Sequence, residues 1–173
     1  ETKDYVESNL NKEFNLNHFI QYPKEYKSCA LQYLKSADVF ISAHYWDPAS
    51  PKIFEIKDLE KLGNLKVIGD ITCDVDGSVP TTIRSSTIDN PNFYIDRNTF
   101  KETVDEGLAI MAVDNLPSEL PRDSSKEFGD GIVREVIPYI LNEDDGRILN
   151  ATITLNGSFL KKYNYLNDYI KTA

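Results

Sequence analysis

The sequence has few cysteines, no block of basic residues and no long apolar run, and each of these absences excludes a class of protein. Cys29 and Cys73 are too few for a disulfide framework and lack the C-x-x-C spacing of zinc and redox motifs. With 19 basic and 28 acidic residues, the net charge of −9 argues against a nucleic-acid partner. No apolar stretch approaches the roughly 20 residues that cross a bilayer, so no membrane span is predicted. These absences favour an intracellular protein of the cytoplasm or the mitochondrial matrix.

The first residues, ETKDYVESNLNKEF, include no initiator methionine and no basic-then-apolar order of a signal peptide. We therefore expect the chain to begin inside a larger protein. Hydrophobic residues make up 40% of the 173 positions and aromatic residues 11%, which is enough for a packed core.

Short apolar runs alternate with helical patterns over the first two thirds of the chain. The pattern predicts a helix over 23–37 followed by a strand over 38–42. A short helix over 56–63, a second strand over 65–71 and a third over 107–115 follow. Helices that alternate with unbroken apolar strands are typical of a parallel sheet covered on both faces. The sequence therefore predicts the α/β fold class.

The remaining segments have weaker patterns. FYI, at 93–95, is a candidate short strand, and Ser124 or the serine after it is a candidate N-cap for a helix that ends near Leu141. ILNATITL, at 148–155, predicts a strand or an extended segment, and 160–171 predicts a terminal amphipathic helix.

Three polar loops follow the three predicted strands, from His44 to Lys52, from Asp70 to Ser78 and from Asp114 to Ser125. In open α/β sheets, ligands bind in the crevice outside the carboxyl ends of the strands. The three loops are therefore the candidate site.

The second of these loops belongs to the stretch GDITCDVDGS, which has three aspartates. A calcium loop is disfavoured, because Thr72 would stand at the first ligand position and Ile83 at the position of the bidentate glutamate. Two interpretations stay open from the residues alone. The aspartates belong to a solvated turn, or they are carboxylates that hold an ammonium group or orient a base at the end of a buried strand.

The other candidates also leave alternatives open. His44, Tyr45 and Trp46 are either packing residues or flat rings at a crevice mouth that suit a planar ligand. Cys73 has no nearby histidine to activate it, so we expect a small buried residue. The sequence contains no P-loop, no G-x-G-x-x-G turn and no metal-ligand pattern.

Several motifs together resemble one family. LKVIGDITCDVDGS, SSTIDNPNFYI and AIMAVDNLPSELPRDSSKEFGDGI, in this order, resemble the carboxyl-terminal part of the alanine dehydrogenase, saccharopine dehydrogenase and pyridine-nucleotide transhydrogenase superfamily. The resemblance covers roughly residues 18–173. AVDNLPSELP, FGD and TITLNGSFLKKYNYL are most similar to the lysine-ketoglutarate reductase branch.

The resemblance implies an enzyme in which a Rossmann-type coenzyme domain is inserted into a catalytic domain. Residues 1–141 are then the later half of the coenzyme domain with its connecting helix, a partial Rossmann-type parallel sheet with flanking helices. Residues 142–173 return to the catalytic domain. The family's basic catalytic residues and its glycine-rich coenzyme turn have no counterpart here, so the implied partner is the remainder of the same enzyme.

The resemblance also implies roles for individual residues. Asp74 matches the family aspartate that faces the substrate and the reacting nicotinamide, and Asp70 matches the aspartate that opens the same motif. Asn115, with Leu116 and Pro117, matches the segment that borders the coenzyme.

Tyr45 and Trp46 match an aromatic loop beside the coenzyme or the substrate. Asp76 is a departure from the family pattern, where this position usually carries no acid.

The implied function is a saccharopine-type dehydrogenase that interconverts lysine plus 2-oxoglutarate and saccharopine, with NAD or NADP as the coenzyme. An imine that accepts hydride needs fixed negative charge and a rigid platform for the nicotinamide. Two alternatives stay open: an alanine dehydrogenase-type oxidoreductase, and a non-catalytic binding or assembly module of the same fold.

Overall fold

The computed structural model describes residues 2–170. The chain folds as two compact units, Glu1–Glu119 and Leu120–Ala173, and each is described here by itself. Among residues 2–170, no helix is both long and apolar enough to cross a membrane.

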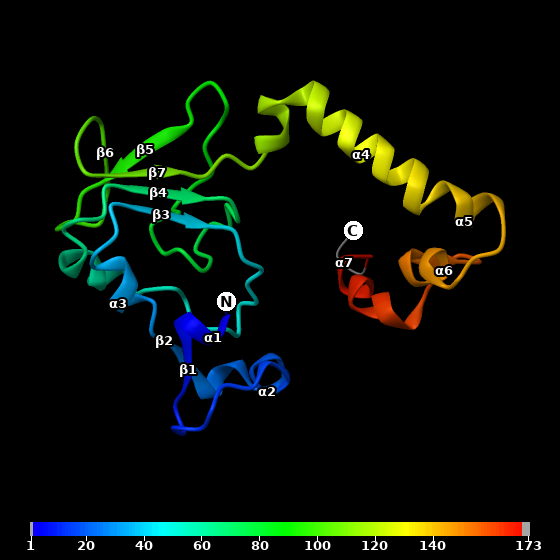
Figure 1. Cartoon of the computed structure of the whole chain (residues 1–173), viewed down its shortest axis with the longest axis horizontal. Helices are drawn as coiled ribbons and strands as arrows, with labels where there is room; N and C mark the ends of the chain where they lie inside the picture. The colour runs from blue at the N-terminus through cyan, green and yellow to red at the C-terminus, as the bar shows by residue number, and fades with distance from the viewer. Residues whose placement is uncertain (1, 171–173) are drawn as a thin grey trace. The chain divides into compact units, whose positions relative to one another are not determined.

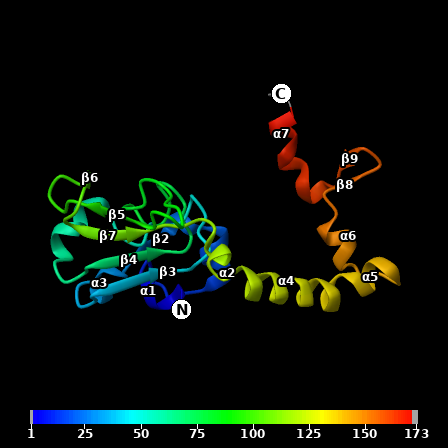
Figure 2. The same ribbon diagram turned by 90° about the horizontal axis from the view of Figure 1, so that it is seen from above.

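The first unit is built on a five-stranded sheet in the order β3-β4-β7-β5-β6 (Figure 1). Its strands are β3 (Val39–Ser42), β4 (Val67–Asp70), β5 (Asn92–Ile95), β6 (Glu102–Thr103) and β7 (Leu108–Met111). Figure 2 shows β3, β4 and β7 lying side by side when the unit is seen from above. The observed α/β architecture confirms the predicted fold class, and the strands predicted near 38–42, 65–71, 93–95 and 107–115 are all present.

The sheet is mixed rather than parallel. β3, β4 and β7 run parallel, whereas β5 is antiparallel to β7 and β6 is antiparallel to β5. A short connection joins β5 to β6 over residues 96–101, and only antiparallel neighbours are joined so tightly. The expectation that both faces are covered is wrong for β3, where Val39 is 55% exposed and Ile41 is 66% exposed.

The core lies against β4, β7 and β5. Large side chains with 0% exposure come from these strands and from the 3-10 helix Ile56–Lys61 and the turn after it: Leu59, Leu62, Leu65, Ile68, Ile95, Leu108 and Ile110. Arg97 ties the turn to the sheet, because its guanidinium donates hydrogen bonds to the carbonyl oxygens of Leu62 and Leu65. The short helix predicted over 56–63 is present as the 3-10 helix Ile56–Lys61.

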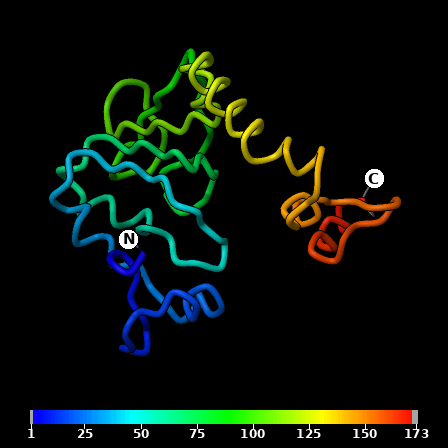
Figure 3. Tube along the Cα trace, turned by 45° about the vertical axis from the view of Figure 1, so that its right-hand side comes forward, coloured from blue at the N-terminus to red at the C-terminus, as the bar shows by residue number. Residues whose placement is uncertain are grey.

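A smaller two-stranded sheet pairs β1 (Val6–Ser8) with β2 (Tyr26–Ser28) in the antiparallel sense. The helix predicted over 23–37 is wrong in its middle, because β2 interrupts it. Only the 3-10 helix Pro23–Glu25 and α3 (Leu31–Leu34) are helical there. Figure 3 traces this blue amino-terminal segment, which also contains α1 (Thr2–Tyr5) and α2 (Leu16–Gln21), before the chain enters β3.

The second unit is mainly helical. Its elements are α4 (Pro121–Glu135), α5 (Ile137–Leu141), α6 (Arg147–Ala151), β8 (Thr154–Leu155), β9 (Ser158–Phe159), the 3-10 helix Lys161–Leu166 and α7 (Asn167–Ile170). The predicted serine cap is wrong, because α4 begins at Pro121, three residues before Ser124, with the proline in its first turn.

Two further expectations for this unit are corrected. Helix α6 occupies much of the segment predicted as extended over 148–155, because Asp144 accepts hydrogen bonds from the amides of Ile148 and Leu149 at 3.0 Å each. The predicted terminal helix over 160–171 is a 3-10 helix followed by α7, and residue 171 lies outside the described residues.

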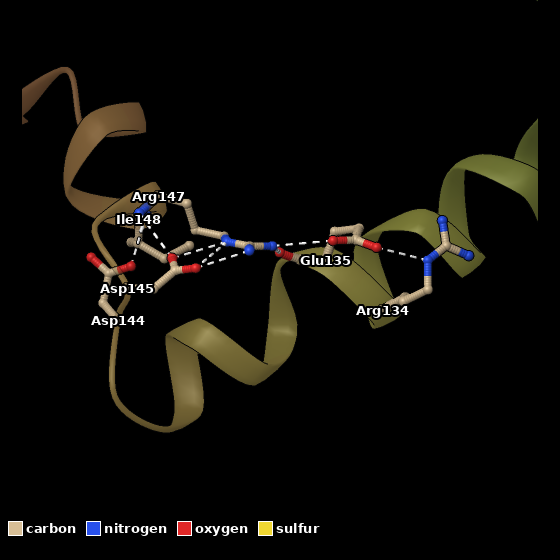
Figure 4. Close-up of polar contacts among 6 residues, drawn as sticks. All are labelled: Arg134, Glu135, Asp144, Asp145, Arg147 and Ile148. Carbon is tan, nitrogen blue, oxygen red and sulfur yellow. Dashed lines mark hydrogen bonds and ion pairs between the residues drawn. The ribbon is translucent and has the colours of Figure 1, made fainter.

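Arg147 joins α4 to α6 within this unit (Figure 4). Its guanidinium is 2.9 Å from an oxygen of Asp145 and 3.1 Å from an oxygen of Glu135. The hydrogen bonds that its guanidinium donates to Asp145, and then to Glu135, raise the pKa of Arg147 above its usual value. Exposed ion pairs contribute little one by one, so the network acts chiefly by fixing the turn between α5 and α6.

Candidate functional site

The candidate site lies at the carboxyl edge of the three parallel strands. β4 is hydrogen-bonded to β3 on one side and to β7 on the other, so the loop after β4 lies between the loops after its two neighbours. In the register of the sheet, Ser42 stands opposite Asp70 at the ends of β3 and β4. The polar loops predicted after these strands are therefore neighbours at one edge of the sheet.

Asp70 is fully buried, and each of its carboxylate oxygens accepts a hydrogen bond from a threonine hydroxyl. Oδ1 accepts from the Thr72 hydroxyl at 2.5 Å and from the Thr72 amide at 3.2 Å, and Oδ2 accepts from the Thr82 hydroxyl at 2.6 Å. A buried carboxylate is tolerated only when its oxygens are paired in this way. Asp70 therefore closes the loop from 70 to 82 onto the end of β4.

Asp74 lies on the outer part of the same loop and is exposed. Its carbonyl oxygen accepts the Gly77 amide at 2.9 Å, and the Asp76 amide donates to Thr82 at 3.2 Å. Cys73 and Asp76 both have positive φ, at 46° and 56°. The loop thus holds Asp74 toward solvent while Asp70 is enclosed, so the two predicted catalytic aspartates have different environments.

Gly77 is required by the close approach of the loop to itself. A Cβ at this position would lie 2.5 Å from the Cβ of Asp74 and 2.7 Å from its carbonyl oxygen. We expect Gly77→Ala to lower the free energy of unfolding of the first unit by about 1–3 kcal/mol, the usual cost of overpacking.

Gly63→Ala is the matched control, because a Cβ at Gly63 meets nothing within 4 Å. Urea unfolding followed by Trp46 fluorescence measures both variants. Equal midpoints for the two would show that the loop opens freely around Asp74 and would contradict the close packing described above.

The loop after β3 contains His44, Tyr45 and Trp46. Tyr45 is 91% exposed, so it is not a core packing residue. Trp46 is half-buried, and its indole nitrogen donates to the carbonyl oxygen of Pro51 at 3.2 Å. The three side chains line a pocket of about 450 Å³ together with Tyr5 and Phe19, which we call the His44 pocket.

His44 is half-buried in this loop. Its Nδ1 lies 3.2 Å from the hydroxyl of Ser42, and its Nε2 is enclosed with no partner among the described residues. Burial lowers the pKa of His44, and the charges of Asp70 and Asp74 oppose that shift only in part. The imidazole is therefore neutral at pH 7, and it lies within electrostatic reach of both aspartates.

The loop after β7 holds Asn115, Leu116 and Pro117. Asn115 is exposed, and its carbonyl oxygen accepts the amide of Ser118 at 3.0 Å, which starts the 3-10 helix Leu116–Glu119. The three residues stand at the same edge of the sheet as Asp74, because β7 is parallel to β4 and paired with it. Their predicted contact with a coenzyme stays a prediction.

Cys73 lies in the loop after β4, close enough to the loop after β7 to feel the charge of Asp114. Burial raises the pKa of the Cys73 thiol, and Asp114, Asp70 and Asp74 add to the rise in that order. The raised pKa keeps the side chain a thiol rather than a thiolate at neutral pH, which agrees with its predicted lack of nucleophilic function. It is half-buried rather than fully buried.

Sequence reasoning missed several polar groups of this edge. Thr72 was detectable in principle, since an aspartate that accepts a bond from the amide two residues on is a common turn pattern. Thr82 lies twelve residues from Asp70, and no local signal reveals that contact. Two buried hydroxyls, Ser78 and Thr81, have no partner among residues 2–170. In the same range, no group of three or more His, Cys, Asp or Glu side chains is arranged to hold a metal ion.

Residues 1–162 match the family described as alanine dehydrogenase/PNT, C-terminal domain. The chain belongs to this dehydrogenase family. The match confirms the family predicted from the motifs around Asp70 and Asn115.

The individual relatives share less than a third of their residues with this chain. The chain is 28% identical to the alpha-aminoadipic semialdehyde synthase of Arabidopsis thaliana over 95% of its own length, and 24% identical to the mitochondrial alpha-aminoadipic semialdehyde synthase of Rattus norvegicus over 83%. It is also 24% identical over 60% of its length to saccharopine dehydrogenase [NAD(+), L-lysine-forming] of Schizosaccharomyces pombe. The chain spans 17%, 20% and 28% of these three proteins, respectively.

Proposed function

We propose that this chain is the coenzyme-binding part of an NAD(P)-dependent amino-acid dehydrogenase of the saccharopine type. The reaction interconverts saccharopine with lysine and 2-oxoglutarate by hydride transfer at the carbon of an imine. The observation that carries the proposal is the arrangement of the carboxyl edge, where an exposed Asp74 stands on a loop that is anchored by a buried Asp70. Membership of the dehydrogenase family and the names of the relatives support the same reaction class.

The two aspartates have separate roles in this proposal. Asp74 supplies fixed negative charge beside the carbon and nitrogen that become cationic in the transition state. Asp70 is a positioning residue, since hydroxyl groups of Thr72 and Thr82 occupy both of its oxygens and leave it no contact with a substrate. Proton transfer belongs to residues outside this chain.

The edge suits one end of a nicotinamide coenzyme. The side-chain amide of Asn115 is exposed at this edge, and an amide donates and accepts the hydrogen bonds that a carboxamide or a ribose hydroxyl needs. The coenzyme itself supplies or accepts the hydride. No glycine-rich turn in the sequence suits the pyrophosphate, so we assign that part to the remainder of the enzyme.

The outer edge of the sheet at β3 supports the proposal that a further part of the enzyme packs against this unit. β3 is the outermost strand on its side, and its side chains Val39 and Ile41 are more than half exposed. Exposed apolar edge strands are a liability that proteins cover with other elements. We therefore propose that the remainder of the same enzyme covers β3, with residues 142–173 contributing to the catalytic domain.

A coenzyme titration tests the proposal. We expect saturable binding of NADH or NADPH by the enzyme that contains this chain, and a loss of about tenfold in affinity in Asn115→Ala, the effect of about 1.4 kcal/mol of lost hydrogen bonding. The same titration with both coenzymes decides between NAD and NADP. If neither coenzyme binds, the chain is a non-catalytic module of the same fold.

A further inference from the structure

Residues 82–86, which we call the 82–86 segment, connect the loop after β4 to the end of β7. Both ends of the segment are buried, since Thr82 is 0% exposed and Ser86 is 2% exposed, whereas Ser85 is exposed. A buried hydroxyl is costly unless it is hydrogen-bonded. Each of the two hydroxyls has a partner, and the two partners belong to different strands of the sheet.

The first end of the segment holds the loop after β4. The Thr82 hydroxyl donates to Oδ2 of Asp70 at 2.6 Å, and the Thr82 carbonyl oxygen accepts the amide of Asp76 at 3.2 Å. These two bonds lie on either side of Asp74 along the chain, one at the end of β4 and one in the outer part of the loop. Thr82 therefore ties down both branches of the loop that carries Asp74.

The second end of the segment holds the end of β7. The Ser86 hydroxyl oxygen accepts the amide of Ala112 at 3.0 Å, and the Ser86 amide donates to the carbonyl oxygen of Ala112 at 2.9 Å. Ser86 also forms a parallel bridge with Val113. Ala112 directly follows β7 and comes shortly before Asn115 in the chain. Ser86 therefore fixes the point where the chain leaves β7 toward Asn115.

The middle of the segment is held against the other strands of the sheet. The Arg84 guanidinium lies 4.4 Å from the centroid of the Phe93 ring on β5, and it donates to both carboxylate oxygens of Glu102 on β6, at 3.0 and 2.7 Å. A half-exposed ion pair contributes little energy, but the paired bonds and the ring restrict the orientation of the guanidinium. The 82–86 segment is therefore held at three points.

We propose that the 82–86 segment sets the position of Asp74 relative to Asn115, with Thr82 and Ser86 as positioning residues of the site. The inference rests on the proposed function, which assigns the fixed charge to Asp74 and a coenzyme contact to Asn115. Hydride transfer requires that the two reacting carbons meet in a narrow range of geometries, so the groups that hold them must keep a constant separation. Thr82 and Ser86 act through other residues, because their hydroxyls are enclosed and already paired.

Hydrogen exchange at two backbone amides tests this link without any need for turnover. The reporters are the amide of Asp76, which is bonded to Thr82, and the amide of Ala112, which is bonded to Ser86. We expect Thr82→Val and Ser86→Ala each to speed exchange about tenfold at the nearer amide and about threefold at the farther one, because local opening then involves the whole segment. A rise confined to the nearer amide would show two independent contacts and would overturn the inference.

Exposed neighbours in the sequence provide the matched controls. Thr87→Val and Ser85→Ala make the same chemical changes at exposed positions, and we expect exchange at both reporter amides to stay at the wild-type rate. Thr82→Ser keeps the hydroxyl and should return both rates close to those of the wild type. Thermal unfolding shows that each variant is folded at the temperature of the exchange measurement.

Turnover of the enzyme that contains this chain tests whether Thr82 acts through Asp74. We expect Thr82→Val to lower kcat about tenfold and Thr82→Ser to recover most of that loss, since a small misplacement of a distant group is enough to slow a reaction. In an Asp74→Asn background, Thr82→Val should lower kcat by less than about threefold, because no charge is left to position. Equal factors in the two backgrounds would overturn the inference.

The outcomes separate this inference from the proposed function. Coupled amide exchange in a protein without dehydrogenase turnover supports the link between the two loops and overturns the proposed function. Dehydrogenase turnover that both Thr82→Val and Ser86→Ala leave at the wild-type level overturns the positioning role and leaves the proposed function standing.

Discussion

Asp70→Ala is expected to lower the free energy of unfolding of the first unit by about 1–3 kcal/mol, the cost of leaving a buried polar group without its hydrogen-bond partner. The side chain is 0% exposed and accepts three hydrogen bonds from Thr72 and Thr82. Without the carboxylate, the Thr82 hydroxyl is left enclosed and unpaired. Urea unfolding followed by Trp46 fluorescence gives the change.

Asp74→Ala is the matched control, because it removes an aspartate from the same loop at an exposed position. We expect its unfolding free energy to stay within about 0.5 kcal/mol of the wild type. Asp70→Asn keeps the shape of the side chain, so its unfolding free energy should fall between those of Asp70→Ala and Asp74→Ala. If Asp70→Ala were as stable as Asp74→Ala, Asp70 would not anchor the loop.

The strands of the large sheet were predictable because their signal is local. Runs such as VFIS and LAIM are rich in residues that favour strands, and tertiary packing agrees with that preference. The helix predicted over 23–37 failed for the opposite reason. Tyr26 is buried and pairs with Ser8 of β1, so a contact eighteen residues away in the sequence overrides the helical spacing of the segment.

The sequence predicts which loops form the candidate site but not the environment of each side chain in them. Strand order places the loops after β3, β4 and β7 together, and their polar residues made them visible in the sequence. The difference between Asp70 and Asp74 was not visible, since it depends on Thr82 and on the turn at Gly77. The sequence leaves open whether His44 is a packing residue or a ring at a crevice mouth, and no local pattern reveals that its Nε2 has no partner among the described residues.

The buried residues of the loop after β4 determine where its exposed aspartate is held. The buried network of Asp70 fixes where the loop leaves β4, and Gly77 lets the loop turn back on itself. Asp74 is therefore presented on a rigid support although its own side chain is solvated. Preorganised charge is what electrostatic catalysis requires, because the group need not reorient when the transition state forms.

If the chain works in the dehydrogenase proposed above, Asp74→Asn is expected to lower kcat of that enzyme about 10²–10³-fold, as for the removal of one preorganised electrostatic group. The amide keeps the shape of the carboxylate but removes the charge that opposes the developing cation. Coenzyme affinity should change little, because Asn115, the residue proposed to contact the coenzyme, is unchanged. Steady-state turnover and a coenzyme titration on the same preparation measure the two effects separately.

Asp76→Asn provides the charge-matched control, since it removes one negative charge two residues away in the same exposed part of the loop. We expect its kcat to stay within about threefold of the wild type, because an exposed charge in water is strongly screened. Equal losses in the two variants would mean that the net charge of the loop, rather than the position of Asp74, supports turnover. A loss confined to Asp74→Asn would place the reacting carbon beside that carboxylate, since only a group close to the developing charge responds so selectively.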